Sequence, residues 1–206
     1  TMSRMPALPD KQALLARVKA GRDHWDQSFR PAGMEVASEG EESVWDYPRP
    51  PIMARDIGKL DPHIRIMHGD SLVAESKRAL VVKETAGAPV PYLPPQDVRI
   101  EWLRPNNNLS VCEWKGVAVS HDITLPDDTQ IADAAWTYPD PFDDLTEGYA
   151  AIAGWFAFYP AKLACFIADA SGYWEHVRPQ PGRYYGGWVI DRIKGPIKGA
   201  PGSGHW

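Results

Sequence analysis

The sequence SVCEWKGVAVSH at residues 110–121 decides how the rest of the chain can be arranged. Its β-branched and aromatic residues predict a strand, along which side chains alternate between two faces. Cys112 and Trp114 would then share one face, and Lys115 would lie on the other. A nucleophile–base pair of Cys112 and Lys115 would therefore need a bulge at Gly116 to bring both side chains to one site.

Short segments on both sides of this stretch also have the composition of strands. Residues 64–67 and 72–74 flank Gly69-Asp70, which predicts a β-hairpin. Pro91 makes the strand predicted at residues 90–93 an edge strand, because proline cannot donate to a ladder. A turn is predicted at residues 105–108, and further strands at residues 80–85, 98–103, 132–138, 153–159 and 163–167. The sequence thus predicts a mainly β protein of short antiparallel strands.

The N-terminal segment instead has the pattern of a helix, over residues 10 to about 29. Asp10 can cap its first turn, and Leu14 and Leu15 belong to a short apolar stripe. Gly21 weakens the pattern, so one helix and two shorter helices are both compatible with it.

These patterns divide the chain into three parts. Residues 1–43 form an N-terminal helical arm and connector, and residues 44–170 form the β domain. Residues 171–206 form an extended tail rich in glycine, proline and aromatic residues. We expect this tail to pack on the domain or on a partner subunit, and in the second case to form the contact of a homo-oligomer.

Composition excludes several classes of partner. The net charge of −5 argues against a nucleic-acid partner, which would require a basic surplus. No apolar run approaches the ~18 residues of a membrane span, and no signal peptide is visible, so we expect no membrane partner and a cytoplasmic location. The six histidines and two cysteines lack metal-ligand spacing, so neither a metal nor a cofactor is expected.

Cys112 is the strongest candidate for chemistry, as a nucleophile. A reactive thiolate needs a cation or base nearby, which Lys115 could supply, with Glu84 as a further reactive or orienting group. The alternative is that Cys112 is a small apolar filler of the core.

A second set of residues could line a pocket for a small-molecule ligand through stacking, cation–π contacts and charge. The alternative is that its aromatic members fill the β core and its charged members lie on the surface. The set comprises Trp45, Tyr47, Arg49, Tyr92, Trp114, Trp136, Tyr138 and Asp140.

Six motifs that occur together and in order indicate a family. They are WDYPRPP at 45–51, ET at 84–85, PYLPPQDV at 91–98, C-x-WKG at 112–116, AWTYPDP at 135–141 and FAFY at 156–159. The set resembles the domain-of-unknown-function family numbered four-two-seven, also labelled a nucleotidyltransferase domain. The resemblance implies a compact fold similar to the β-tent, or Mss4-like, group, and it implies no established reaction. The residue after the cysteine is often proline in that family, whereas here it is Glu113.

The nucleotidyltransferase label gains no support from the residues. The sequence has no G-x-x-x-x-G-K-[ST] loop and no paired acidic residues before a Gly-Ser turn that could hold Mg²⁺ and a triphosphate.

Two functional hypotheses follow from these patterns. The first is a small-molecule-binding β domain that could act as a metal-independent enzyme on a small polar metabolite. The second is a non-catalytic interaction module that uses its aromatic surface and tail for self-association or partner binding. A cavity that encloses aromatic residues with at least two charged groups favours the first, and a filled core with a flat apolar patch outside favours the second.

Overall fold

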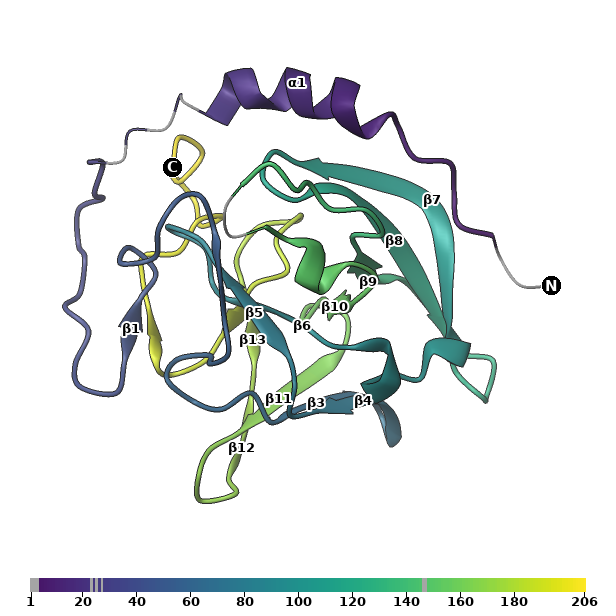
Figure 1. The fold of residues 1–206 in the computed structure, drawn as a ribbon. Coiled ribbons are helices and arrows are strands. Elements are labelled where there is room, and N and C mark those ends of the chain that lie inside the picture. The colour runs from purple at the N-terminus through teal and green to yellow at the C-terminus, as the bar shows by residue number, and fades with distance from the viewer. Residues whose placement is uncertain (1–3, 23, 25, 27, 146–147) are drawn as a thin grey trace.

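The computed structural model describes residues 4–22, 24, 26, 28–145 and 148–206. It confirms a mainly β protein with several antiparallel sheets and a helix near the N-terminus (Figure 1). The more specific expectation of a β-tent fold stays a prediction. Within the described residues, no helix combines the length and the apolar character that a membrane crossing requires.

The first four-stranded sheet shows that the prediction of a single strand through residues 110–121 was wrong. The sheet has the antiparallel order β10-β9-β8-β7, and a tight turn joins β7 to β8 within this stretch. Cys112, the last residue of β7, pairs with Gly116, the first residue of β8. Gly116 has a φ of +103°, a value that favours glycine and lets the chain reverse here. The strands are β7 (Leu103–Cys112), β8 (Gly116–Thr124), β9 (Gln130–Thr137) and β10 (Phe156–Phe158).

The turn predicted at residues 105–108 is also wrong, because these residues lie inside β7. Pro105 pairs with His121 and Leu109 pairs with Val119, so β7 bulges between these two pairs. The strand predicted at residues 98–103 is replaced for the most part by one 3-10 turn, η2 (Ile100–Trp102), which follows another, η1 (Pro95–Asp97). The turn η1 begins at Pro95, whose ring fixes φ near the helical value.

The second four-stranded sheet confirms the predicted hairpin across Gly69-Asp70. Its order is β12-β11-β3-β4, all antiparallel, and Gly69 has a φ of +53° at the turn. The strands are β3 (Ile64–His68), β4 (Ser71–Ser76), β11 (Ala164–Ala168) and β12 (Trp174–His176).

A three-stranded sheet of order β2-β5-β6 completes the main part of the fold. Its strands are β2 (Ile52–Ala54), β5 (Leu80–Lys83) and β6 (Val90–Tyr92). The strand that contains Pro91 lies at the edge, as predicted.

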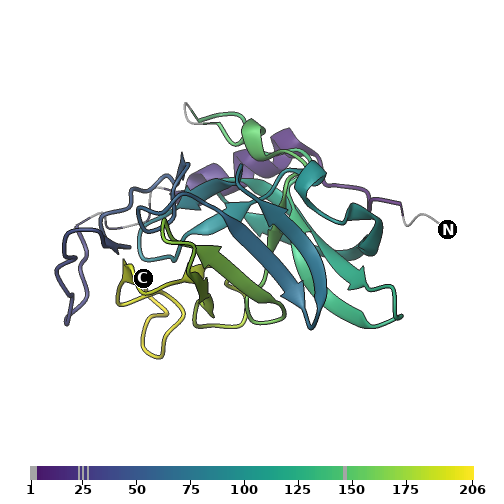
Figure 2. The same cartoon turned by 90° about the horizontal axis from the view of Figure 1, so that it is seen from below.

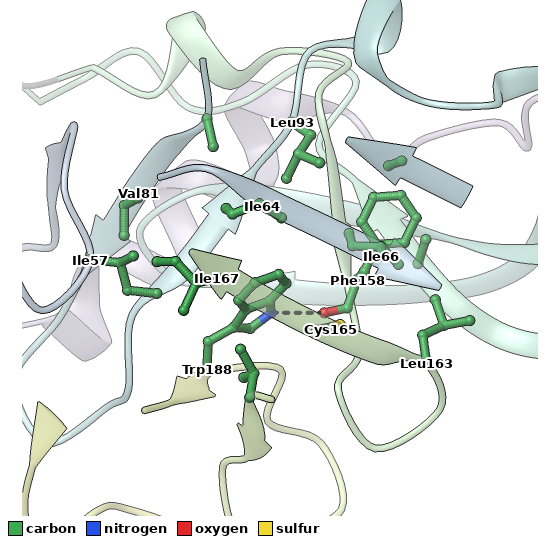
Figure 3. Close-up of a cluster of buried hydrophobic side chains, with 14 of the residues drawn as sticks. Ile57, Ile64, Ile66, Val81, Leu93, Phe158, Leu163, Cys165, Ile167 and Trp188 are labelled. Carbon is green, nitrogen blue, oxygen red and sulfur yellow. Dashed lines mark hydrogen bonds between the residues drawn. The ribbon is translucent and has the colours of Figure 1, made fainter. Parts of the chain in front are cut away.

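The largest hydrophobic core joins the sheets to the C-terminal tail (Figure 3). Ile64 and Ile66 from β3, Phe158 from β10 and Trp188 from the tail are all fully buried. The indole N–H of Trp188 donates a hydrogen bond to the carbonyl oxygen of Phe158 at 3.2 Å. The tail is therefore part of the core.

Two short strand pairs fix the path of the tail. The strands β13 (Arg178–Pro179) and β14 (Trp188–Val189) pair antiparallel, and β15 (Ile193–Lys194) pairs parallel with β1 (Glu42–Ser43). The C-terminal segment consequently lies beside the chain that leads into the first strands (Figures 1 and 2).

The helix α1 (Lys11–Arg22) lies across the outer side of the β7–β8 hairpin (Figure 1). Asp10 caps it as predicted, since its carboxylate accepts a hydrogen bond from the Ala13 amide at 2.7 Å. Leu14 and Leu15 pack with Val117 of β8 in a separate small core. The helix ends at Arg22 and is shorter than predicted, because Gly21 falls in its last turn and weakens continuation.

Candidate functional site

A cavity of about 340 Å³ lies between the β7–β8 turn, the strands β5, β6 and β9, and the C-terminal tail. We call it the aromatic cavity. Its charged lining residues are Arg49, Glu84, Glu113, Lys115 and Lys198, and its thiol is Cys112. Its aromatic lining residues are Tyr92, Trp136, Tyr138, Tyr159, Tyr184 and Tyr185.

The three residues predicted to carry chemistry all line this cavity. Cys112 and Lys115 reach it from opposite ends of the hairpin turn, and Glu84 follows directly after β5. The turn, rather than a bulge in a continuous strand, therefore brings the thiol and the ammonium to one site.

Lys115 is a buried cation. Its exposed fraction is 8%, and its Nζ atom lies 5.8 Å from the ring centroid of Tyr138. Burial disfavours the ammonium, but the surrounding groups that can carry negative charge, Cys112 first, favour it, and the balance raises the pKa of Lys115 well above its usual range. Lys115 is therefore suited to stabilise an anion and is poorly suited to act as a base.

The backbone that carries Lys115 is held from two sides. The carbonyl oxygen of Lys115 accepts a hydrogen bond from the Phe142 amide at 3.0 Å. Arg22 of α1 donates from Nε to the carbonyl oxygen of Glu113 at 2.7 Å and from a terminal nitrogen to Asp144 at 2.7 Å. The N-terminal helix thus fixes the turn from which Lys115 enters the cavity.

Tyr92 and Tyr138 of the cavity wall keep their protons at neutral pH. Burial raises the pKa of Tyr92 to about 12 and raises the pKa of Tyr138 as well. The Tyr92 hydroxyl accepts a hydrogen bond from the indole N–H of Trp136 at 3.3 Å. The phenol groups can therefore donate hydrogen bonds to a ligand.

Arg49 and Glu84 form an ion pair at the edge of the cavity. The Arg49 Nε atom lies 3.6 Å from a Glu84 carboxylate oxygen, and a terminal nitrogen donates to the Thr85 carbonyl oxygen at 3.2 Å. Only 7% of the Arg49 side chain is exposed, so this pair belongs to the wall of the cavity.

Four of the residues predicted to bind a ligand do not line this cavity. Trp45 donates from its indole to the Pro196 carbonyl oxygen at 2.7 Å. Tyr47 is buried and donates from its hydroxyl to Glu42 at 2.6 Å. The other two lie elsewhere in the fold.

Trp114 is buried beneath the guanidinium of Arg22, which lies 5.1 Å from its ring centroid. It packs in the buried cluster that contains Tyr92, Trp136 and Tyr138, but it does not line the cavity itself. Asp140 lies on the surface, where it pairs with Lys11 at 2.8 Å.

The sequence reasoning missed the tail as a cavity wall. Gln180, Tyr184, Tyr185, Gly186, Gly187 and Lys198 all line it. Gly186 packs so closely on the indole of Trp136 that a Cβ atom would lie 2.2 Å from a ring carbon. The run YYGGW at residues 184–188 is the signal that could have found this contact, because paired glycines mark close approach.

The described residues contain no group of three or more His, Cys, Asp or Glu side chains that could hold a metal ion. The second cysteine, Cys165, is fully buried in the main core, where burial raises the pKa of its thiol. The polar groups that line the aromatic cavity include a thiol, ammonium groups, carboxylates and phenols.

Comparison with known proteins identifies the family. A search of curated proteins found no match. A family model described as a domain of unknown function, DUF427, matches residues 56–169. The matched segment contains Glu84, Cys112 and Lys115, whereas Arg49 and the tail lie outside it. Since the match covers more than half of the chain, this protein belongs to the DUF427 family.

Proposed function

We propose that this protein is a small-molecule-binding β domain that takes a small polar metabolite into the aromatic cavity. The observation that carries the proposal is the convergence of Cys112, Lys115 and Glu84 on one cavity that aromatic side chains line. A volume of about 340 Å³ is at the small end of known ligand pockets, which supports a metabolite-sized ligand.

The same groups support metal-independent enzyme chemistry. The Lys115 ammonium would stabilise a thiolate on Cys112, which is the nucleophilic form of cysteine. Glu84, oriented by Arg49, would place or exchange a proton at the edge of the cavity.

A non-catalytic interaction module is the second candidate. It is favoured by Tyr184, which is 82% exposed, and by Tyr185, which is 37% exposed, because both lie on the tail beside the cavity. In this case the tail would contact a partner or a second copy of the chain. We further infer a cytoplasmic location, because Cys112 and Cys165 are both unpaired.

The experiment that tests the proposal is a screen of aromatic fragments by ligand-observed NMR. It compares the untreated protein with protein in which Cys112 has been alkylated. Alkylation of Cys112 with N-ethylmaleimide places a bulky group on the cavity wall, while the fully buried Cys165 is protected. We expect fragments that bind the untreated protein and lose binding after alkylation. The Cys112→Ala variant is the matched control, because the reagent should leave its binding unchanged.

Fragment binding that survives alkylation would place the ligand elsewhere. An absence of binding in the untreated protein would overturn the proposal and leave the interaction module.

A further inference from the structure

The Lys115 ammonium has no hydrogen-bonding or ion-pairing partner among the residues that the structure describes, although 92% of the residue is buried. Its Nζ atom faces the ring of Tyr138, and the residue lines the aromatic cavity. Burying a charge without a partner of opposite charge is unfavourable. A partner of opposite charge that enters the cavity would remove this cost.

The charges of the cavity wall also favour an anion. Three cationic residues face two carboxylates, so the wall has one formal positive charge in excess, whereas the whole chain has a net charge of −5. Arg49 is already paired with Glu84, and burial lowers the pKa of Lys198. We therefore assign the excess positive charge of the cavity wall to Lys115.

The neutral groups around Lys115 suit an anion with a flat body. Tyr92 and Tyr138 present phenol groups, which donate hydrogen bonds to oxyanions. Trp136 and Tyr138 also line the cavity, and their largely buried rings give its wall an apolar surface. One unpaired ammonium and these donors match a single negative charge, whereas a polyphosphate would require several cations or a metal ion.

We propose that the aromatic cavity binds a small organic anion of single charge, with its anionic group on the Lys115 ammonium and its unsaturated body against Trp136 and Tyr138. This inference rests on the proposed function and adds the class of ligand.

The test compares benzoate with benzamide and benzylamine, which have the same size and differ in charge. Dissociation constants are measured by NMR titration of the whole protein. We expect benzoate to bind at least about tenfold more tightly than either neutral or cationic probe, because a hydrogen bond to a charged group contributes more than a neutral one. Phenyl phosphate, with a second charge, should bind more weakly than benzoate.

The Lys115→Met variant keeps an unbranched stem, one atom shorter, and removes the charge, so it should abolish the preference for benzoate. Lys77→Met, on an exposed lysine remote from the cavity, is the matched control and should retain the preference. Lys198→Met tests the second lysine of the wall, and loss of the preference in this variant alone would overturn the assignment to Lys115.

The comparison of probes on the unmodified protein remains decisive if Lys115→Met fails to fold. Equal binding of benzoate, benzamide and benzylamine would overturn the inference and leave the proposed function standing. Tighter binding of phenyl phosphate than of benzoate would overturn the inference that the ligand has a single negative charge. An absence of binding by every probe and every screened fragment would overturn both proposals.

Discussion

Asp133 adopts a positive φ of +49° in the middle of β9, which a non-glycine residue does only when its surroundings compensate. One carboxylate oxygen of Asp133 accepts hydrogen bonds from Ser120 at 2.6 Å, Asn108 at 2.8 Å and Asn106 at 2.9 Å. The bulge of β7 places both asparagines over β9. A single carboxylate thus ties together three strands of the first sheet.

We predict that this carboxylate makes the stability of the protein depend on pH in the acid range. The hydrogen bonds from Ser120, Asn108 and Asn106 lower the pKa of Asp133 to about 2, from an ordinary value of 3.8. Because the folded-state pKa is depressed, the contribution is present above about pH 4 and is lost as the pH falls through about 2. Asp133→Asn should therefore lower the free energy of unfolding by about 1 kcal/mol at pH 6, after allowance for solvent screening.

Urea unfolding from pH 6 to pH 2 measures this difference. The gap between the wild type and Asp133→Asn should narrow as the pH falls below 4. A gap that stays constant across this range would show that Asp133 does not titrate with a depressed pKa.

At the residue scale, the chemical groups of the site could be predicted better than their neighbours. Glu84, Cys112 and Lys115 were predicted to form one reactive set, and all three line one cavity. Trp114 could not be placed, because an indole in a turn has the same sequence signature as an indole on a strand. Its ring contacts the guanidinium of Arg22 and the cluster that contains Tyr92, and both residues are far away in the sequence.

At the scale of elements, the helix α1 contacts the turn of the site through one buried side chain, Arg22. Arg22 pairs with Asp144, whose side chain is 12% exposed, and donates to the backbone of the β7–β8 turn. Lys19 is the second partner of Asp144, at 3.5 Å, and its side chain is far more exposed than that of Arg22. The helix is thereby linked to the turn that carries Lys115.

We predict that Arg22→Ala lowers the free energy of unfolding by about 2 kcal/mol, because Asp144 keeps the more distant Lys19, at 3.5 Å, and the Trp114 ring loses its contact with the guanidinium. Arg17→Ala is the matched control on the exposed face of the same helix and should change stability by less than about 0.5 kcal/mol. Denaturant unfolding measures both. Equal losses of unfolding free energy in the two variants would mean that the contacts of Arg22 with Asp144 and Trp114 do not stabilise the fold.

Turn chemistry explains which elements could be predicted. The β3–β4 hairpin turns at Gly69-Asp70, a dipeptide with a strong turn preference, and it lies where the sequence indicates. The β7–β8 hairpin turns through residues 113–115, Glu-Trp-Lys, none of which favours a turn. Its only local signal is Gly116, and glycine in a strand pattern is equally compatible with a bulge.

At the scale of the whole molecule, the tail closes a cavity that the family segment only partly builds. The Gln180 side chain accepts from the Ala88 amide at 3.0 Å and donates to the Lys198 carbonyl oxygen at 2.9 Å. These bonds tie two parts of the tail to the β5–β6 connection. Such long-range docking leaves little trace in a local pattern, which explains why sequence reasoning placed no tail residue in the site.

The close contact of Gly186 with Trp136 provides a test of this closure. A Cβ atom at residue 186 would lie 2.2 Å from the indole, so Gly186→Ala must displace either the tail or the ring. Overpacking of this kind costs about 1–3 kcal/mol. The backbone amides of Trp188 and Lys198 hold the tail by donating hydrogen bonds to the carbonyl oxygens of Pro89 and Ala86. We therefore predict that these amide hydrogens exchange at least about tenfold faster in Gly186→Ala.

Hydrogen exchange followed by NMR measures this effect, and Gly204→Ala is the matched control, since a Cβ atom there meets nothing within 4 Å. The control should leave the exchange rates of Trp188 and Lys198 unchanged. If Gly186→Ala left them unchanged as well, the tail would be tolerant of a side chain at the cavity wall. In that case the tail would not define the shape of the cavity, and the selectivity of the site would reside in the family segment alone.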